Sequence, residues 1–295
     1  MKPRRNTSAS AGALPFAWLV ALFLIPFVLV FKLSLSDVAL SIPPYAPQFD
    51  LKALPTFFAA LDFETYRRLV TDNLYVSAYL SSLRFAAVAT ALLALIGYPL
   101  AYGISRCSKT PREILVLLVV LPFFTSFLIR VYAWIAILKP AGILNAGLEA
   151  LGLPSVSILN TDAAVYIGLV YAYLPFMVLP LYAALEKQDE TLIEAAQDLG
   201  ATNFAAFWRV TFPLSLPGLS AGSLLCFIPI VGEFVIPDLL GGSRTLMIGK
   251  TIWIEFFSNR DWPAASAAAT VLLLTLVLPI VLYQRQQARM LEAER

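Results

Sequence analysis

The sequence contains no histidine and only two cysteines among its 295 residues. Histidine is the commonest metal ligand and general base near neutral pH, so its absence removes the side chain most often used for both tasks. Cys107 lies in a short basic loop and Cys226 in an apolar run, and the two are expected on different sides of a membrane. They cannot form a zinc site together, and no disulfide is expected.

Charge is also scarce, since 14% of the residues are charged and 59% are hydrophobic, whereas soluble domains carry about a quarter charged residues. The net charge of +2 is too small to indicate a nucleic-acid partner. No Gly-x-x-x-x-Gly-Lys-Ser/Thr phosphate loop occurs, so the chain is not expected to bind a nucleotide cofactor itself. Its length would allow two soluble domains, but long apolar runs override that estimate.

Six apolar segments are long enough to cross a bilayer, which takes about 20 helical residues. They lie at residues 14–35, 75–104, 114–138, 163–185, 216–237 and 263–283. Runs of this length favour helices, because backbone polar groups in lipid must be satisfied within the segment. The first run exceeds the core of a signal peptide, about 7–15 residues, and is expected to be an uncleaved signal-anchor. The prediction is an all-α integral membrane protein with one transmembrane domain, residues 14–283, between tails 1–13 and 284–295.

The orientation follows from basic residues in the short loops and tails. These are Lys2, Arg4 and Arg5, then Arg106, Lys109 and Arg112, then Arg285, Arg289 and Arg295. Six spans place all three groups on one side, which the positive-inside rule makes cytoplasmic. Both termini and the polar loop 186–215 are therefore expected in the cytoplasm.

Proline and glycine interrupt the spans. They occur at Pro26, Pro99, Pro122, Pro175 and Pro229, and at Gly97, Gly168, Gly222 and Gly232. Such residues kink membrane helices and let two backbones approach closely. Ordinary helix packing and bending around a pathway that opens both fit this pattern, and the spacing does not separate them.

Three charged residues lie within the spans, where each must be paired or hydrated. Arg84 and Arg130 can reach towards the outer surface or pair with Glu233. Glu233 lies four residues before Pro237, and Asp238 follows that proline. An acidic pair at the outer end of a kinked span can attract a cation, so Glu233 and Asp238 are candidate pathway residues.

Aromatic residues are expected at a similar depth. They are Tyr132 and Trp134 in the third span and Tyr171, Tyr173 and Phe176 in the fourth. Interfacial belts of tryptophan and tyrosine explain such clusters, and so do ring faces offered to an organic ammonium ion. Tyr171 and Tyr173 are two residues apart on a helix and cannot face the same way. Tyr132, Trp134 and Tyr173 are kept as candidates for the pathway.

The polar loop reads as two short helices. Thr191 and Glu194 fit a capping box at the start of the first, and Gly200 suits the left-handed residue that ends it. Asn203 is expected to cap a second helix, 204–210, and Pro213 to close the unit. Ala195 and Ala196 lack bulk, so a partner backbone can come close. A surface for another protein is therefore predicted, with an amphipathic hairpin lying on the membrane as the alternative.

The loop resembles the cytoplasmic signature of permease subunits of binding-protein-dependent ABC importers. The likeness rests on Glu194, Ala195, Ala196, Gly200, Val210 and Pro213, with Phe212 where leucine is usual. Residues 42–45, 126–134, 171–177, 232–237 and 259–263 extend it over most of the chain towards putrescine-type permeases of Gram-negative bacteria.

The resemblance implies a type I importer fold whose loop 186–215 forms coupling helices docked on an ATPase. It implies a second homologous permease, two ATPase subunits that bind ATP and Mg²⁺, and a periplasmic polyamine-binding protein. The cargo would be a polyamine, putrescine before spermidine or another small organic solute, moved by alternating access. A membrane-embedded enzyme and a passive channel are the rival classes, and the lack of histidine and the small number of buried acids disfavour the enzyme.

Overall fold

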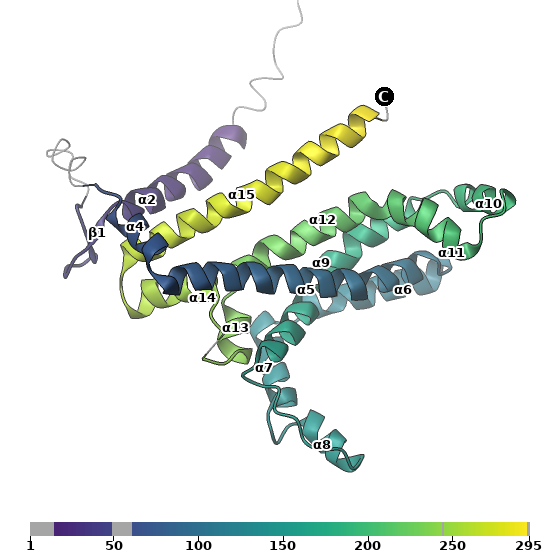
Figure 1. Ribbon diagram of the computed structural model, residues 1–295, viewed down its shortest axis with the longest axis horizontal. Helices are drawn as coiled ribbons and strands as arrows, with labels where there is room; N and C mark the ends of the chain where they lie inside the picture. The colour runs from purple at the N-terminus through teal and green to yellow at the C-terminus, as the bar shows by residue number, and fades with distance from the viewer. Residues whose placement is uncertain (1–14, 49–60, 244, 294–295) are drawn as a thin grey trace, which may run out of the picture. The chain divides into compact units, whose positions relative to one another are not determined.

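A computed structural model describes residues 15–48, 61–243 and 245–293 (Figure 1). Within these ranges six helical segments are long and apolar enough to cross a membrane, with mean hydropathies between 1.6 and 2.5. The prediction of an all-α membrane protein with six spans is confirmed. The basic residues of the N-terminal tail, Lys2, Arg4 and Arg5, lie outside the described residues, whereas the last helix, α15 (Trp262–Ala293), continues into the expected C-terminal tail.

The chain forms two compact units, and each is described by itself. The first unit comprises residues up to Val76 together with Thr251–Thr275. Its elements are η1 (Val20–Leu24), α2 (Ile25–Ser34), β1 (Asp37–Val38), β2 (Tyr45–Ala46), α4 (Glu64–Thr71), η4 (Ile254–Ser258) and the first part of α15. The two strands pair antiparallel, with Asp37 opposite Ala46.

Polar contacts between distant residues hold the first unit together. The hydroxyl of Tyr75 donates to Glu255 Oε1 at 2.9 Å, and Asn259 donates to the other carboxylate oxygen at 2.9 Å. Arg68 pairs with Asp261 at 3.0 Å. Glu255 is only 5% exposed, and these two donors supply the partners that a buried carboxylate requires.

The second unit comprises Ser77–Lys250 and the end of α15. Its elements are α5 (Asn73–Ser105), α6 (Lys109–Val120), η2 (Leu121–Phe124), α7 (Phe127–Leu138), α8 (Ile143–Ala150), α9 (Asp162–Glu186), α10 (Thr191–Asp198), α11 (Asn203–Ala206), η3 (Phe207–Thr211), α12 (Phe212–Val231), α13 (Val235–Leu240) and α14 (Ile248–Trp253). The helices α5 and α14 begin in one unit and end in the other.

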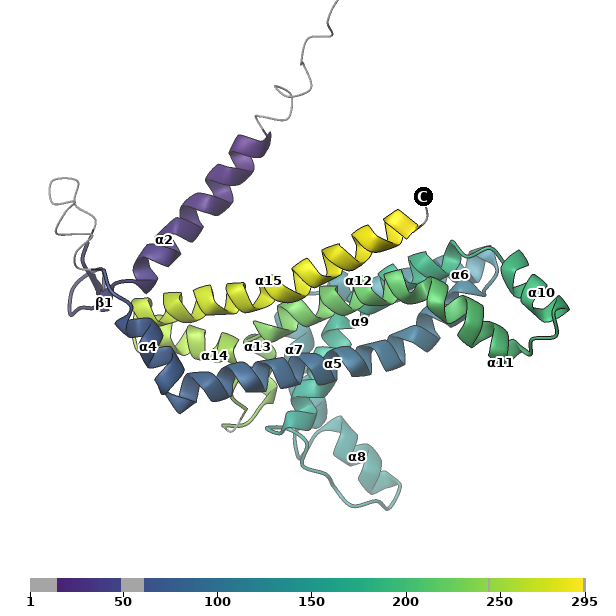
Figure 2. The same ribbon diagram turned by 45° about the horizontal axis from the view of Figure 1, so that its top comes forward.

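Close helix packing in the second unit depends on glycine. Met177 of α9 lies between Gly97 of α5 and Gly222 of α12, where an added Cβ would approach its side chain to 2.9 and 3.0 Å. Gly218 faces Ala184 and the backbone of Pro180 in the same way. The helices α9 and α12 accordingly run side by side in both views (Figures 1 and 2). At these positions the glycines serve helix packing, as small residues do between membrane helices.

The expected third span, 114–138, is wrong as one continuous helix. The helix α6 ends at Val120, a 3₁₀ turn containing Pro122 follows, and Thr125 is extended with ψ of 153°. Proline lacks the N–H that a continuing α-helix needs, so the backbone hydrogen bonds are interrupted there. The candidate span in this region is instead Phe127–Ala150.

The expected fifth span, 216–237, also differs from the structure. The helix α12 starts at Phe212 and ends at Val231, and α13 begins only at Val235. Gly232, Glu233 and Phe234 form a break between these two helices. Glu233 therefore lies at a helix junction and not inside a span.

Candidate functional site

The polar loop folds as two short helices around Gly200. Gly200 has φ of +87°, a conformation that suits glycine, and its N–H donates to Gln197 O at 2.8 Å. The N–H of Ala201 closes the turn on Ala196 O at 3.0 Å. The predicted left-handed helix end is confirmed.

The caps differ by one residue from those expected. Thr191 is the first helical residue of α10, and its N–H donates to Asp189 Oδ1 at 3.0 Å. Two hydrogen bonds from Thr191 lower the pKa of Asp189. At the second helix Thr202 is the cap, and its hydroxyl accepts from Ala205 N at 3.3 Å. Asn203 instead accepts from the Gln197 side chain at 2.8 Å, which joins α10 to α11.

Pro213 does not close the unit, contrary to the prediction. The chain passes from α11 through η3 into α12 without a break, and Pro213 lies in the first turn of α12. Proline is tolerated there because first-turn N–H groups have no partner within the helix. The second short helix is therefore the beginning of a longer one. Val210 lies in its η3 part and is half-buried.

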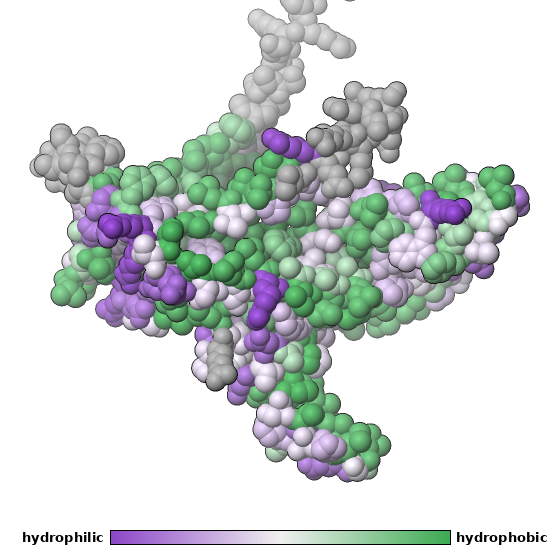
Figure 3. Space-filling model, viewed as in Figure 1, coloured by the Kyte–Doolittle hydropathy of each residue, from purple (hydrophilic) through white to green (hydrophobic). Residues whose placement is uncertain are grey.

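The α10–α11 hairpin, residues 189–206, presents mostly exposed side chains. None of the residues of α10 is buried, and Glu194 and Ala195 are exposed. Apolar side chains are exposed too, with Leu199 at 90% and Phe204 at 75%. The hairpin lies at one end of α9 and α12 in both views, and Figure 3 shows hydrophobic and hydrophilic residues mixed at that end. A mixed, uncovered surface of this kind suits a protein partner.

Ion pairs fix the base of the hairpin. Arg106 pairs with Glu190 at 3.0 Å, and Arg112 pairs with Glu186 at 3.0 Å. The side-chain amide of Gln188 donates to Thr211 O at 3.0 Å, which joins the two ends of the loop. Arg106, directly after α5, thus holds the hairpin itself at Glu190, while Arg112 joins α6 to the end of α9 beside it.

A second group of candidate residues surrounds the break between α12 and α13. The hydroxyl of Tyr173 donates to Glu233 Oε2 at 2.6 Å. The N–H groups of Val235 and Ile236 point to Oε1, at 3.0 and 3.4 Å. Glu233 therefore stabilises the start of α13, where a negative charge is favourable, and stays half-buried.

The start of α14 and Thr245 just before it are tied to three other elements and to this break. Thr245 donates to Asp162 at 3.1 Å, and the N–H of Ile248 donates to Ser82 Oγ at 2.8 Å. Gly249 packs against the break itself, because an added Cβ would lie 2.3 Å from Gly232 O and 2.7 Å from Glu233 O. Lys250 pairs with Asp238 at 3.2 Å.

The remaining pathway candidates do not converge on Glu233. Trp134 packs edge-to-face on Tyr171, with ring centroids 5.5 Å apart, and Tyr132 is 57% exposed. Tyr171 and Tyr173 face different partners, as their spacing predicts. Asp238 is paired with Lys250.

Arg84 and Arg130, which were expected to reach the outer surface or to pair with Glu233, do not pair with it in the described part of the chain. Arg84 pairs with Asp162 at 2.9 Å, a partner that the sequence did not indicate. Neither arginine pairs with Glu233, since no ion pair joins them among the described residues. Arg130 lies against the rings of Phe123 and Phe127, at 5.9 and 5.7 Å.

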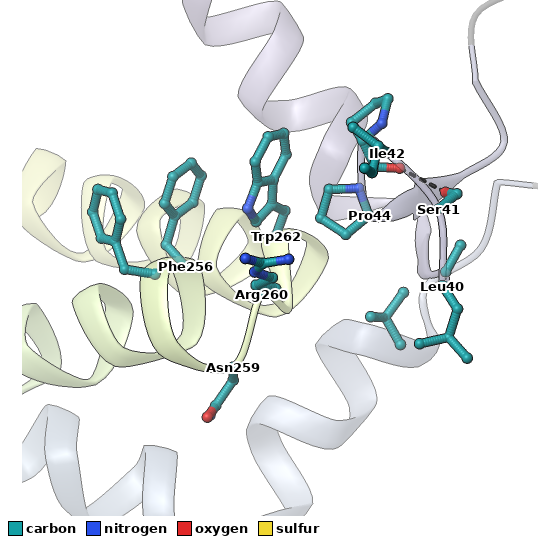
Figure 4. Close-up of a pocket in the computed structure, with 12 residues that line it drawn as sticks. Leu40, Ser41, Ile42, Pro44, Phe256, Asn259, Arg260 and Trp262 are labelled. Carbon is teal, nitrogen blue, oxygen red and sulfur yellow. Dashed lines mark hydrogen bonds between the residues drawn. The ribbon is translucent and has the colours of Figure 1, made fainter.

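The first unit contains an open cavity of about 840 Å³. Figure 4 shows it between the loop with Leu40 and Ile42 and the side chains of Phe256 and Trp262. Arg260 is the one charged residue among those that line it. A cavity lined by an arginine and by no carboxylate is poorly suited to bind a dication. The break at Glu233, in contrast, offers a carboxylate.

The comparisons with known proteins settle the family. A model of the binding-protein-dependent transport system inner membrane component family matches residues 94–291. The chain belongs to this family. As one of these inner membrane components it is a multi-pass transport protein and not an enzyme.

Two relatives and one solved structure show the extent of the similarity. The chain is 42% identical over 276 residues to the spermidine/putrescine transport system permease protein PotB of Haemophilus influenzae, and the match covers 92% of this chain and 91% of the relative. It is 41% identical over 224 residues to PotB of Escherichia coli K12, covering 75% and 81%. A bacterial ABC transporter for alginate import matches in fold, with a TM-score of 0.70, 19% identity, and coverage of 95% and 96%. The expected permease fold is confirmed.

Proposed function

We propose that the chain is the transmembrane permease subunit of an ATP-driven importer that moves a polyamine, putrescine before spermidine, into the cytoplasm. The observation that carries this proposal is the 42% identity, over nearly the full length of both chains, to a permease named for spermidine and putrescine transport. The expected partners are a second homologous permease, two ATPase subunits that hold ATP and Mg²⁺, and a periplasmic polyamine-binding protein. Another small organic solute is the alternative cargo.

The α10–α11 hairpin is the proposed contact with the ATPase. Exposed Glu194 and Ala195 on α10 and the fixed turn at Gly200 support this role. Since Arg106 after α5 pairs with Glu190 of the hairpin, and Arg112 joins α6 to the end of α9 next to it, a displacement of the ATPase would be passed to the membrane helices. This role places the hairpin, and by the positive-inside rule both termini, in the cytoplasm.

Glu233 is the proposed cation-attracting residue of the pathway. It lies at a break in a membrane helix, where irregular backbone is tolerated if it lines a cavity or is buried in protein. Its hydrogen bonds to Tyr173 and to the α13 backbone hold its carboxylate in place. An ammonium group would compete with the Tyr173 hydroxyl for this carboxylate. Such competition makes binding weak enough for release.

The test is reconstitution of the chain with a second permease, the ATPase and the binding protein in proteoliposomes. ATP-dependent uptake of labelled putrescine is expected, and excess unlabelled spermidine reports the relative preference. A preparation that hydrolyses ATP but accumulates neither polyamine would contradict the assignment of cargo. Flux of either polyamine without ATPase would instead support a passive channel.

A further inference from the structure

The end of α5 presents one row of side chains to the loop that carries the α10–α11 hairpin. Tyr98, Tyr102 and Arg106 are spaced four residues apart, and the N–H of Arg106 still donates to Tyr102 O at 3.2 Å. Residues at this spacing lie on the same face of a helix. We refer to the three as the α5 row, and it contacts both legs of the loop.

The first leg is held by charge and the second by aromatic rings. Arg106 pairs at 3.0 Å with Glu190, at the start of α10, and its central carbon lies 5.2 Å from the ring centroid of Tyr102. Phe207 of η3 meets the rings of Tyr98 and Tyr102 edge-on, with centroids 5.7 and 5.5 Å apart. Such ring pairs stabilise beyond the apolar area that they bury. A displacement of either leg therefore acts on α5.

The other end of α5 reaches the break that holds Glu233. Ser82 is fully buried, and its Oγ accepts at 2.8 Å from the N–H of Ile248, the first residue of α14. The next residue, Gly249, packs directly on the carbonyl oxygens of Gly232 and Glu233. At 1.5 Å per residue, about 24 Å of helix separates Ser82 from the nearest member of the α5 row. One helix thus contacts the hairpin loop at one end and, through α14, the backbone beside Glu233 at the other.

A second, covalent route runs through α12. The chain continues from the hairpin through η3 into α12 and reaches the break from that side. The helix α14 packs on the break and is tied to α5. If the hairpin moves α5 and α12 by different amounts, the fit of α14 on the break must change, because the close packing at Gly249 leaves no space between the two backbones.

We propose that α5 couples the hairpin to the proposed cation site. The α5 row receives the movement of the hairpin, and Ser82 passes it to α14 and so to the backbone that positions the Glu233 carboxylate. Tyr102 and Ser82 are positioning residues, since they act through Phe207 and Ile248. The inference rests on the proposed function, which supplies the ATPase at the hairpin and the cargo at Glu233.

The experiment measures how far putrescine with its binding protein stimulates ATP hydrolysis over the basal rate, in proteoliposomes that contain the complete transporter. Tyr102→Leu removes the ring that meets Phe207, and Ser82→Ala removes the acceptor for Ile248. Each is expected to lower the stimulation about threefold or more, within the range of changes along a coupling network. Independent defects this far apart would multiply to about ninefold. Because both substitutions interrupt one connection, the double variant is expected to be no worse than the more severe single variant.

Thr245→Val is the matched control for Ser82→Ala. It removes another hydrogen bond of the segment around the start of α14, but one to Asp162 of α9 and not to α5. Combined with Tyr102→Leu, its effect is expected to multiply. Tyr102→Phe keeps the ring and is expected to keep the wild-type stimulation. Recovery of the ATPase with each variant shows that the transporter is assembled.

Full stimulation with either Tyr102→Leu or Ser82→Ala, or a double variant in which the two losses multiply, would overturn the proposal. So would losses from Thr245→Val and Tyr102→Leu that do not multiply, since the connection would then not depend on α5. If spermidine and not putrescine stimulates the wild type, only the assigned cargo is wrong, and the same ratios are measured with spermidine. A wild-type transporter that neither polyamine stimulates would contradict the proposed function itself.

Discussion

The hydroxyl of Tyr173 and the carboxylate of Glu233 are joined by a hydrogen bond of 2.6 Å between α9 and the break that follows α12. The same carboxylate accepts from two N–H groups of α13. The carboxylate of Glu233 thus stabilises the start of α13 and also places a negative charge at the break between α12 and α13. Substitution by glutamine separates these two roles.

Glu233→Gln keeps the size of the side chain and an oxygen for the α13 backbone but removes the charge. We expect uptake of putrescine at low concentration to fall about tenfold or more, because a charge–ammonium contact is worth at least about 1.4 kcal/mol in such a site. Asp238→Asn is the control, since Asp238 is 56% exposed and pairs at the surface. Unchanged uptake with Glu233→Gln would leave Glu233 a helix cap only.

Gly249→Ala tests the close packing of α14 against the break. The new methyl would meet Gly232 O and Glu233 O at distances that real Cβ atoms do not adopt, so the backbone must shift. Overpacking of this kind costs about 1–3 kcal/mol. Thermal unfolding of the purified chain in detergent is expected to begin at a lower temperature.

Gly103→Ala is the matched control for that substitution. Gly103 also lies in a helix, but no atom would lie within 4 Å of an added Cβ. Alanine there should be neutral or stabilise by about 0.5–1 kcal/mol through helix propensity. Equal destabilisation by both substitutions would refute the packing argument at Gly249.

Gly200→Val tests the turn of the hairpin. Gly200 has φ of +87° in open space, so a β-branched residue meets backbone strain without a steric clash against another element. The left-handed conformation costs such a residue roughly 1–2 kcal/mol, and the hairpin is expected to lose its geometry. We expect cargo-stimulated ATP hydrolysis to be lost while the chain remains inserted.

Gly152→Val controls for strain alone. Gly152 has φ of +72° and equally open surroundings, but it follows α8 and lies outside the hairpin. Normal stimulation is expected for this variant. If cargo stimulates ATP hydrolysis equally in transporters carrying Gly200→Val and Gly152→Val, the hairpin does not couple transport to the ATPase.

Arg112→Lys and Arg106→Lys distinguish the two ion pairs at the base of the hairpin. Arg112 uses three nitrogens, since Nε and Nη2 donate to Cys107 O at 3.1 and 2.9 Å and Nη1 donates to Glu186. Lysine cannot reproduce this fork, so a loss of about 1–3 kcal/mol is expected in thermal unfolding. Arg106 donates one side-chain hydrogen bond to the exposed Glu190 and lies over the Tyr102 ring, which a lysine can also do, so its replacement by lysine should cost less than about 1 kcal/mol. The reverse order of the two effects would contradict this distinction.

Several local features could be predicted because they depend on neighbouring residues. Gly200 ends a helix since its left-handed φ is accessible to glycine, and Tyr171 and Tyr173 diverge because of helical periodicity. The caps were misplaced by one residue, since Glu190 and not Thr191 is at the N-cap position of α10, where Asp189 accepts from the first helical N–H, and Thr202 and not Asn203 caps α11. Neighbouring polar residues offer equivalent caps, and only the backbone angles select among them.

By itself the sequence determined the class of this protein and the number of its spans, because transfer of an apolar run into lipid is a local property of that run. Only the tertiary structure decided where the third and fifth spans break and which groups Glu233, Arg84 and Gly249 contact. These contacts join residues far apart in the chain, such as Tyr173 with Glu233 and Gly249 with Gly232. They depend on how helices pack and rotate against one another, and no hydropathy pattern along one segment contains that information.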